Sequence, residues 1–365
     1  MAPSQISGRW RRVLRLLVVA HAVAACAGVP PAASLPASPA AVAPSTPGAS
    51  SPAASSLVSP TPGPTRTPAP GPYAGIAIVK VEAQSILLLK RDVGFLAATA
   101  DSVWAATSVG LIRIDPRTLE IQDVDSVPRF GLAATTNAVW VSDFDGGTVS
   151  RFDPARSRQA ASVELPGNPN AIAVFGDSIW VAQHRGGSVT RLKGPSAKLV
   201  AVVEVGPVGS SGPHAVAADK TAVLVGITNI QSVVRIDPST NHVVATIPTK
   251  TSPCGGIALQ PDAVWVSSCF DDRMAVRIDP RSNTVVTEID IGGHNGGPVL
   301  VDGYPWFPVG NLLVRIDPAT NRIDRIVQFW KTPDFDAYGS TVAFDSVWVG
   351  GTGRIARIPL AAVQD

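Results

Sequence analysis

Three histidines, His184, His214 and His294, stand in sequence contexts that occur once in an otherwise repetitive chain. The contexts are "VAQHRGG", "SSGPHAVAAD" and "IGGHNGGP". Because an imidazole titrates near neutral pH, His214 or His294 could act as a general base, and any of the three could contact a ligand. The alternative is that each ring is held by backbone groups of its own loop. Both interpretations stay open from the sequence.

Acidic and aromatic side chains outside the repeat are the other ligand-binding candidates: Asp143, Asp145, Asp271, Asp272, Trp330, Asp334 and Tyr338. Together with the histidines they could line a polar and aromatic pocket. Residues 143–147, "DFDGG", begin like a calcium-binding loop but lack the later carboxylates, and the matching "QHRGG" favours a hairpin turn. Trp330 could equally pack over its own loop. We predict no metal site and no cofactor from these residues.

A repeated unit must position these residues. One segment of each unit has a Trp in a "VWV"-like context, and Leu224 stands where one Trp is missing; the seven positions are 104, 140, 180, 224, 265, 306 and 348. Each unit also has an Arg, generally followed by Ile-Asp-Pro, at 113, 151, 191, 235, 277, 315 or 357. A period near 40 residues with several β-rich segments is typical of propeller blades. We expect these arginines to lie between blades and pair with neighbouring carboxylates.

The predicted fold is all-β, a seven-bladed β-propeller whose blades are four-stranded and antiparallel. In one unit the strands are expected at 255–259, 263–269, 274–279 and 284–290, where Trp, Val, Ile and Thr suit sheets packed on both faces. The last unit lacks a fourth strand. Residues 85–93, "SILLLKRDV", are expected to supply it and so close the ring.

The phrase "RIDPSTN" predicts the corner between the third and fourth strands. Asp237 can accept hydrogen bonds from the turn backbone, Pro238 fixes φ, and Asn241 tolerates the left-handed conformation that completes a hairpin. The repetition of this phrase therefore has a structural cause.

Loop lengths indicate where a site should lie. The first and second strands are always separated by the same number of residues, whereas the spacing from Trp to Arg varies from 9 to 12 and that from Arg to the next Trp from 27 to 33. The variable loops leave the same end of a propeller, and loops on a rigid scaffold often carry binding residues. We expect the candidate residues to gather there, around the mouth of the axial channel.

Cys254 and Cys269 are expected to form a disulfide. If Leu259 pairs with Val264 across the first hairpin, the two cysteines are directly opposed, at a Cα separation that a disulfide can span. Export from the cytosol would allow the bridge to persist.

The amino terminus predicts export and anchoring. Residues 1–25 read as a lipoprotein signal peptide, with four arginines before a short apolar run, and "VAAC" places Cys26 at the position that would be lipidated. An ordinary cleaved signal is the alternative. Residues 26–72, rich in Pro, Ala, Ser and Thr, predict a disordered tether, and 73–365 form the propeller. The expected location is extracytoplasmic, on a membrane through the lipid anchor.

Charge excludes one class of partner. The chain has 30 Lys plus Arg and 28 Asp plus Glu, a formal net charge of +2, so no basic field is available for nucleic acid. We expect a monomer that binds a small molecule, a glycan or a protein.

The repeat, as in "AVWVSSCFDDRMAVRIDPRSNTVVTEIDIGG", resembles those of YVTN-type propellers, which are similar to the virginiamycin B (streptogramin) lyase and NHL-repeat propellers. The resemblance covers residues 74–365 and implies the propeller fold. It also implies one activity, opening of a cyclic depsipeptide ester by elimination with a His base, a Glu and Mg²⁺. His214 or His294 could supply the base, but the glutamates at 120, 164, 204 and 288 fall on outer strands, so the expected pair is not matched.

We therefore favour a binding or interaction module over an enzyme, acting through the variable-loop end. A streptogramin lyase-like enzyme is the alternative. Other catalytic signatures, such as H-E-x-x-H and G-x-S-x-G, do not occur in the sequence.

Overall fold

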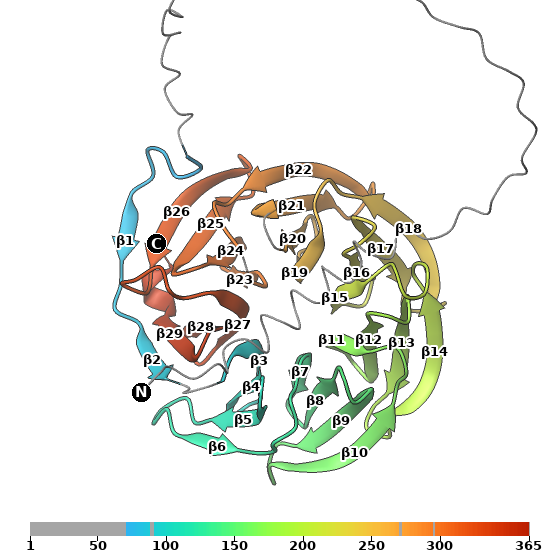
Figure 1. Cartoon of the computed structure of the whole chain (residues 1–365). Helices are drawn as coiled ribbons and strands as arrows, with labels where there is room; N and C mark the ends of the chain where they lie inside the picture. Colours follow the sequence, from blue (N-terminus) through green and yellow to red (C-terminus); the bar gives the residue numbers. More distant parts are fainter. Residues whose placement is uncertain (1–70, 88–90, 270–271, 295, 365) are drawn as a thin grey trace, which may run out of the picture.

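A computed structural model describes residues 71–87, 91–269, 272–294 and 296–364. Its strands form seven sheets around a common axis, which confirms the predicted seven-bladed propeller (Figure 1). In each blade the first strand lies nearest the axis and the last lies at the rim (Figure 1). The predicted signal peptide and almost all of the predicted tether, with Cys26, lie outside the described residues.

The strands follow one another from the axis to the rim within each blade. Blade 1 contains β3 (Val93–Ala98), β4 (Val103–Thr107), β5 (Gly110–Ile114) and β6 (Ile121–Asp123). Blade 2 contains β7 (Leu132–Thr135), β8 (Ala138–Asp143), β9 (Thr148–Asp153) and β10 (Arg158–Glu164). Blade 3 contains β11 (Pro169–Phe175), β12 (Ser178–Gln183), β13 (Ser188–Lys193) and β14 (Lys198–Glu204). Blade 4 contains β15 (Pro213–Ala218), β16 (Val223–Ile227), β17 (Ser232–Asp237) and β18 (His242–Pro248).

The last three blades continue the pattern. Blade 5 contains β19 (Pro253–Leu259), β20 (Val264–Ser268), β21 (Met274–Asp279) and β22 (Thr284–Asp290). Blade 6 contains β23 (Val299–Val301), β24 (Tyr304–Val309), β25 (Leu312–Asp317), β26 (Arg322–Gln328) and, outermost, β1 (Ile78–Lys80). Blade 7 contains β27 (Ala337–Ala343), β28 (Ser346–Gly351), β29 (Arg354–Pro359) and β2 (Gln84–Leu87), and a 3-10 turn, η3 (Leu360–Ala362), follows. The predicted boundaries in blade 5 agree with these to within two residues.

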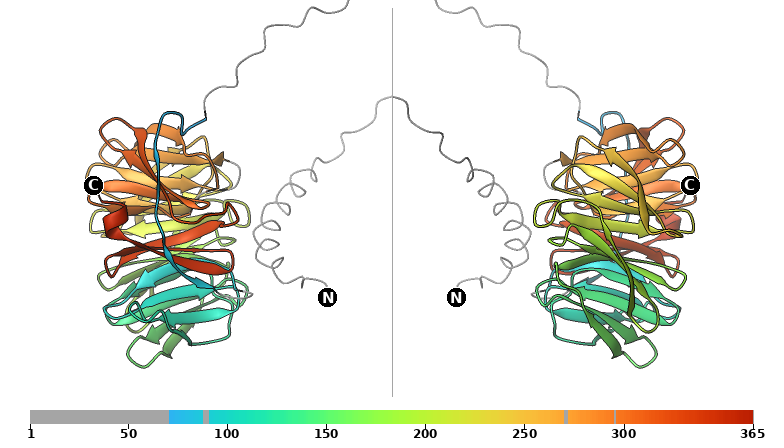
Figure 2. Two further views of the ribbon diagram at one scale, coloured as in Figure 1. Left: turned by 90° about the vertical axis from the view of Figure 1, so that its left-hand side faces the viewer. Right: turned by 90° about the vertical axis from the view of Figure 1, so that its right-hand side faces the viewer.

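The amino-terminal strands close the ring. β2 pairs antiparallel with β29, from Gln84 opposite Arg357 to Leu87 opposite Arg354, which confirms the predicted closure with a shorter strand. β1 pairs in parallel with β26, an addition that the sequence pattern does not predict. The segment runs along the rim from blade 6 to blade 7 (Figure 2). The edge of the last blade is therefore covered.

The buried tryptophans join each blade to the next. All six Trp of the repeat are at most 2% exposed, and each lies in one apolar cluster with residues of the following blade. For example, Trp180 of blade 3 packs with Val223 and Ile236 of blade 4. The second strands are buried on both faces, which explains their continuous apolar runs.

Three of the repeated arginines bind the corner between the third and fourth strands of the next blade. Arg191 lies over its own Trp180, with 5.0 Å from Cζ to the ring centroid. Its Nη1 donates to the carbonyl of Pro238 at 2.7 Å and to Oδ1 of Asn241 at 2.8 Å. Asn241 is left-handed, with φ of 60°, as the corner requires. The same pattern recurs for Arg235 on Asn283 and Arg277 on Asn321.

The expectation that the repeated arginines pair with neighbouring carboxylates is wrong for these three blades. It is confirmed for Arg113, 2.9 Å from Asp101, and for Arg315, 3.0 Å from Asp324. In the three blades with the corner contact the acceptors are neutral because the Asp of the corner is occupied: Asp237 Oδ1 accepts hydrogen bonds from the backbone N–H and the hydroxyl of Ser239, at 2.8 and 2.7 Å. The carbonyl oxygen of Pro238 and the amide oxygen of Asn241 are therefore the acceptors for the guanidinium of Arg191.

Within the described part of the chain, no helix combines the length and the apolarity that crossing a membrane requires.

Candidate functional site

The two ends of the propeller differ in their loops. Loops between second and third strands, and loops between blades, leave one end, called the loop face; the short turns leave the other, called the turn face. Every described candidate residue lies in a loop or at a strand end of the loop face. This is the distribution that the variable loop lengths predict.

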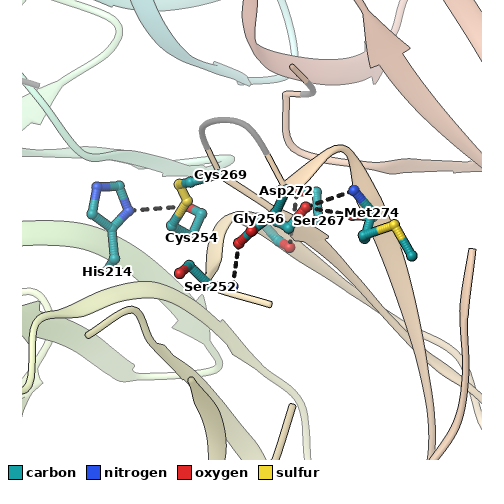
Figure 3. Close-up of a disulfide and its surroundings, with 9 residues drawn as sticks. His214, Ser252, Cys254, Gly256, Ser267, Cys269, Asp272 and Met274 are labelled. Atoms are coloured by element: carbon teal, nitrogen blue, oxygen red, sulfur yellow. Dashed lines mark hydrogen bonds between the residues drawn. A yellow bond between two sulfur atoms is a disulfide. The ribbon is translucent and has the colours of Figure 1, made fainter. Parts of the chain in front are cut away.

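His214, the second residue of β15, is held by the neighbouring blade. Its Nδ1 lies 2.9 Å from the carbonyl oxygen of Cys254 at the start of β19 (Figure 3). A carbonyl only accepts, so Nδ1 carries the proton and Nε2 carries the lone pair. Although the residue is only partly buried, desolvation lowers the pKa of the His214 imidazole from 6.5 to about 4, and the bond to Cys254 offsets this only partly. The imidazole is therefore neutral at physiological pH.

Rings from four blades stack beside His214, and we call Phe95, Phe130, Phe144, His184 and His214 the axial ring cluster. The ring centroid of His214 lies 5.7 Å from that of Phe130 and 5.8 Å from that of His184. Phe144 lies 5.9 Å from His184 and 5.8 Å from Phe130, and Phe95 lies 5.9 Å from Phe130. All five of these contacts are tilted or edge-on, within the range of centroid distances that favours aromatic pairs. The cluster thus joins first strands and loops of blades 1 to 4 into one apolar wall.

His294 belongs to a second group. Its ring centroid lies 5.9 Å from that of Tyr338 in β27, at 80° between the planes. The Tyr338 hydroxyl is 3.3 Å from Oγ1 of Thr352. The structure therefore brings two of the three candidate histidines together, His184 and His214, and pairs the third with a different candidate.

The loop between blades 6 and 7 folds over itself. Trp330 lies under the guanidinium of Arg354, with 4.6 Å from Cζ to the ring centroid, and 6.3 Å from the ring of Phe335. The carboxylate of Asp334 is 3.6 Å from Arg354 and also accepts a hydrogen bond from the hydroxyl of Thr332. Hydrogen bonding to Thr332 and attraction to Arg354 lower the pKa of Asp334, despite an opposing effect of desolvation. These contacts favour the packing interpretation of Trp330 and Asp334.

The acidic candidates between second and third strands hold turns. Asp143 Oδ1 accepts the backbone N–H three residues on, at 2.8 Å, and Asp272 Oδ2 accepts the backbone N–H of Ser252 at 2.7 Å. Asp145 is exposed in the turn that follows β8. The hairpin interpretation of residues 143–147 is therefore the one that fits. Asp271 lies outside the described residues.

The donor set near the axis does not suit Mg²⁺. Among the residues that the structure describes, no three His, Cys, Asp or Glu side chains form a group that could hold a metal ion. His214 is surrounded by aromatic rings and a backbone carbonyl, whereas Mg²⁺ prefers carboxylates and water. The lyase-like metal is thus not matched by the residues beside the candidate base.

Cys254 and Cys269 form the predicted disulfide, with 5.4 Å between their Cα atoms (Figure 3). Leu259 does pair with Val264, but the register shifts at a bulge between Pro253 and Gly256. The cysteines are therefore not directly opposed in the ladder as the constant register predicts. The bridge fixes the start of β19, whose carbonyl holds His214.

Comparison with known proteins identifies the fold. No family model matches the sequence, and no curated protein matches it. Among solved structures, the chain is similar to a streptogramin B lyase, with a TM-score of 0.65 and 17% identity over 75% of this chain and 96% of that chain. It is also similar to virginiamycin B lyase from Staphylococcus aureus, with a TM-score of 0.64 and 17% identity over 76% of this chain and 98% of that one.

A third similarity limits what these matches mean. A chain of a mitotic checkpoint complex superposes with a TM-score of 0.65 at 10% identity, over 76% of this chain and 94% of that chain. Proteins of unlike biology therefore match equally well, so the likeness is one of the propeller fold. It agrees with the resemblance read from the repeat.

Sequence reasoning missed the aromatic members of the axial ring cluster. Phe95, Phe130 and Phe144 stand in apolar or turn contexts that are typical of core residues, and Phe130 and Phe144 are only 5% and 7% exposed. One available signal was that Phe144 lies between two candidate acids and occurs once at that repeat position.

Proposed function

We propose that the protein is a membrane-anchored, extracytoplasmic binding module whose loop face takes a small, uncharged molecule at the axial ring cluster. The observation that carries the proposal is the state of His214. Its ring is neutral, its Nδ1–H is used by the Cys254 carbonyl, and Nε2 makes no hydrogen bond among the described residues. An imidazole acceptor in an aromatic wall suits a ligand with an apolar ring and a hydroxyl or N–H donor.

Charge supports an uncharged ligand. The axial ring cluster contains no carboxylate, ammonium or guanidinium group, so an ion placed beside His214 would lose its hydration without gaining an opposite charge. A hydroxyl needs only one acceptor and loses less on burial.

The alternative is a lyase, favoured by the similarity to streptogramin and virginiamycin B lyases. A general base works best when its pKa lies near the operating pH. With a pKa of about 4, His214 would be a weak base at neutral pH. This is the physical reason to prefer binding over elimination by His214.

Phenol and anisole form a matched pair of probes for the axial ring cluster, because only phenol has a donor for Nε2. Ligand-observed NMR titration should show that wild type prefers phenol, with the preference falling about tenfold in His214→Phe, the loss expected for one hydrogen bond. His242→Gln, on the rim strand β18, is the matched control and should bind like wild type. Equal binding of both probes by wild type and by His214→Phe would refute the proposal.

Incubation with quinupristin and Mg²⁺, followed by mass spectrometry, tests the alternative. We expect the depsipeptide to remain intact. A linearised product that disappears in His214→Phe would replace the binding module with a lyase.

The membrane anchor is tested separately at Cys26. Radiolabelled palmitate should enter wild type and not Cys26→Ala, since the thiol is the acceptor in a lipoprotein. Equal labelling of the two proteins would exclude lipidation at this residue and leave the ordinary cleaved signal.

A further inference from the structure

Blade 4 lacks the tryptophan that every other blade places against its neighbour. Leu224 occupies the position, is 3% exposed, and lies in one cluster with Val264 and Ile278 of blade 5. In blade 3 the equivalent Trp180 contacts the equivalent residues of blade 4. The interface between blades 4 and 5 therefore has the same kinds of surrounding apolar residues as the interface between blades 3 and 4, but a smaller side chain at its centre.

The other blades show what an indole ring contacts at this position. The face of the indole lies against the repeated Arg. The distance from Cζ to the ring centroid is 5.0 Å for Arg191 over Trp180 and 5.3 Å for Arg277 over Trp265. In three blades the indole N–H donates to the residue five positions earlier. The acceptors are Thr99 Oγ1 at 3.2 Å, Gln260 Oε1 at 2.7 Å and the Ala343 carbonyl at 3.0 Å.

Blade 4 keeps both contact groups. Arg235 is held in the usual place, with Nη1 donating to Oδ1 of Asn283 at 2.9 Å. Asp219 stands five positions before Leu224, where three of the other blades have the indole acceptor. Blade 4 therefore lacks the indole ring but keeps the guanidinium of Arg235 and the oxygen acceptor of Asp219.

A cavity of about 320 Å³ lies at this place on the turn face. Leu224, Ile247, Leu259, Val264 and Ile278 give it an apolar wall, and Asp219 and Arg235 also line it. Its volume is at the low end for small-molecule sites. An apolar cavity left where a large side chain is absent can bind a benzene-sized molecule.

Asp219 and Arg235 both have atoms that could make further hydrogen bonds in the cavity. Asp219 Oδ1 accepts the backbone N–H groups of Thr221 and Ala222 and the Thr221 hydroxyl, while Oδ2 has no hydrogen-bond partner among the described residues. Likewise, Nε and Nη2 of Arg235 have none in this part of the chain, whereas Arg191 uses both on Ser178. Ala222 replaces that serine in blade 4, which leaves the inner side of the guanidinium open.

Asp219 is anionic at neutral pH. Burial by itself would raise the pKa of its carboxyl, but hydrogen bonds from Thr221 and Ala222 and the charge of Arg235 outweigh it and lower the pKa. The cavity therefore offers a charged acceptor at one edge and a cation at one face.

We propose that this cavity between blades 4 and 5 binds a planar aromatic molecule with an N–H donor at its edge, of which indole is the simplest. The ring stacks on the Arg235 guanidinium and fills the apolar wall, and the N–H donates to Asp219. This repeats the geometry that the chain's own tryptophans adopt in the other blades. The site is on the turn face and is independent of the axial ring cluster.

Indole and benzofuran test the proposal, because they share a shape and only indole has the N–H. Titration followed by ligand-observed NMR should show saturable binding of indole, about tenfold tighter than that of benzofuran. Leu224→Trp should fill the cavity and weaken indole binding by at least about tenfold, because the new side chain occupies the same space. Val244→Trp, at a 55% exposed position on the rim of the same blade, is the matched control and should leave binding unchanged.

A second variant keeps the proposal testable if Leu224→Trp fails to fold. Asp219→Asn retains an oxygen for the turn and presents an amide N–H to the cavity, so the preference for indole over benzofuran should disappear. Absence of saturable indole binding up to about 5 mM would overturn the proposal, since that limit corresponds to a negligible affinity. Indole binding by folded Leu224→Trp equal to that of wild type, or an undiminished indole preference in Asp219→Asn, would overturn it as well.

Discussion

Asn241 performs two separable tasks at the corner of blade 4. Its Oδ1 accepts a hydrogen bond of 2.8 Å from the Arg191 guanidinium of blade 3, and its backbone holds φ at 60°. Asn241→Gly removes the amide oxygen and keeps the left-handed backbone, because glycine adopts that conformation freely. Asn241→Ala removes the oxygen and also forces a Cβ into the strained region.

The two variants should differ by a predictable amount. Loss of a hydrogen bond to a charged group costs about 1.5 to 3 kcal/mol, and the lower value applies because both residues are half-buried and Arg191 keeps its bond to Pro238. We therefore expect Asn241→Gly to lower the free energy of unfolding by about 1.5 kcal/mol. Asn241→Ala should lower it by about 1 kcal/mol more, the cost of left-handed backbone in a residue with a Cβ.

Urea unfolding followed by fluorescence measures these free energies, with the disulfide intact and the slope compared among variants. Arg191→Met in the background of Asn241→Gly supplies the double-mutant cycle. If Arg191 and Asn241 join the blades through their hydrogen bond, Arg191→Met should lower the free energy of unfolding less in the Asn241→Gly variant than in wild type. Asn241→Gly indistinguishable from wild type, or equal effects of Gly and Ala, would show that the repeated Asn does not join the blades in the way described.

Three further predictions concern the axial site and the closure of the ring. Removal of the bridge by Cys254→Ala with Cys269→Ala should cost about 3 kcal/mol of unfolding free energy, the value for a loop of this length, and thiol reagents should label neither cysteine in native wild type. The pKa of His214 is about 4 when folded and near 6.5 when unfolded, so the unfolded state binds the extra proton between these values. The contribution of His214 to stability should be complete above pH 6.5 and fall by up to about 1.4 kcal/mol per pH unit towards pH 4, and His214→Gln should reduce the slope measured in urea titrations by this amount. A chain that starts at residue 91 loses the strand that covers β29 and should aggregate in size-exclusion chromatography, while a chain that starts at residue 71 should stay monodisperse.

Repetition made much of the fold predictable. The Trp and Arg positions recur at nearly constant spacing, and each unit contains its own strands, corner and apolar pattern. These are local properties, so blade number, strand order and the left-handed Asn241 follow from short stretches of sequence. Closure by residues near 85 was predictable because the last unit lacks one strand, and an unpaired edge is costly.

The candidate site was predictable in location but not in arrangement. Loop lengths indicated the correct end of the molecule for His184, His214 and His294. They did not indicate that the first two share a wall with Phe130, because residues from different blades meet only when the ring closes.

The sequence by itself determined the number of blades, the corner chemistry and the place of the single missing tryptophan. Only the tertiary structure decided that Arg191, Arg235 and Arg277 bind neutral oxygens of the next blade, that His214 is neutral, and that a cavity stays open beside Leu224. The reason is physical: propensity and turn chemistry act within a few residues, whereas a pKa, an acceptor or an unfilled volume depends on which surfaces of distant segments meet and on whether they can close the gap.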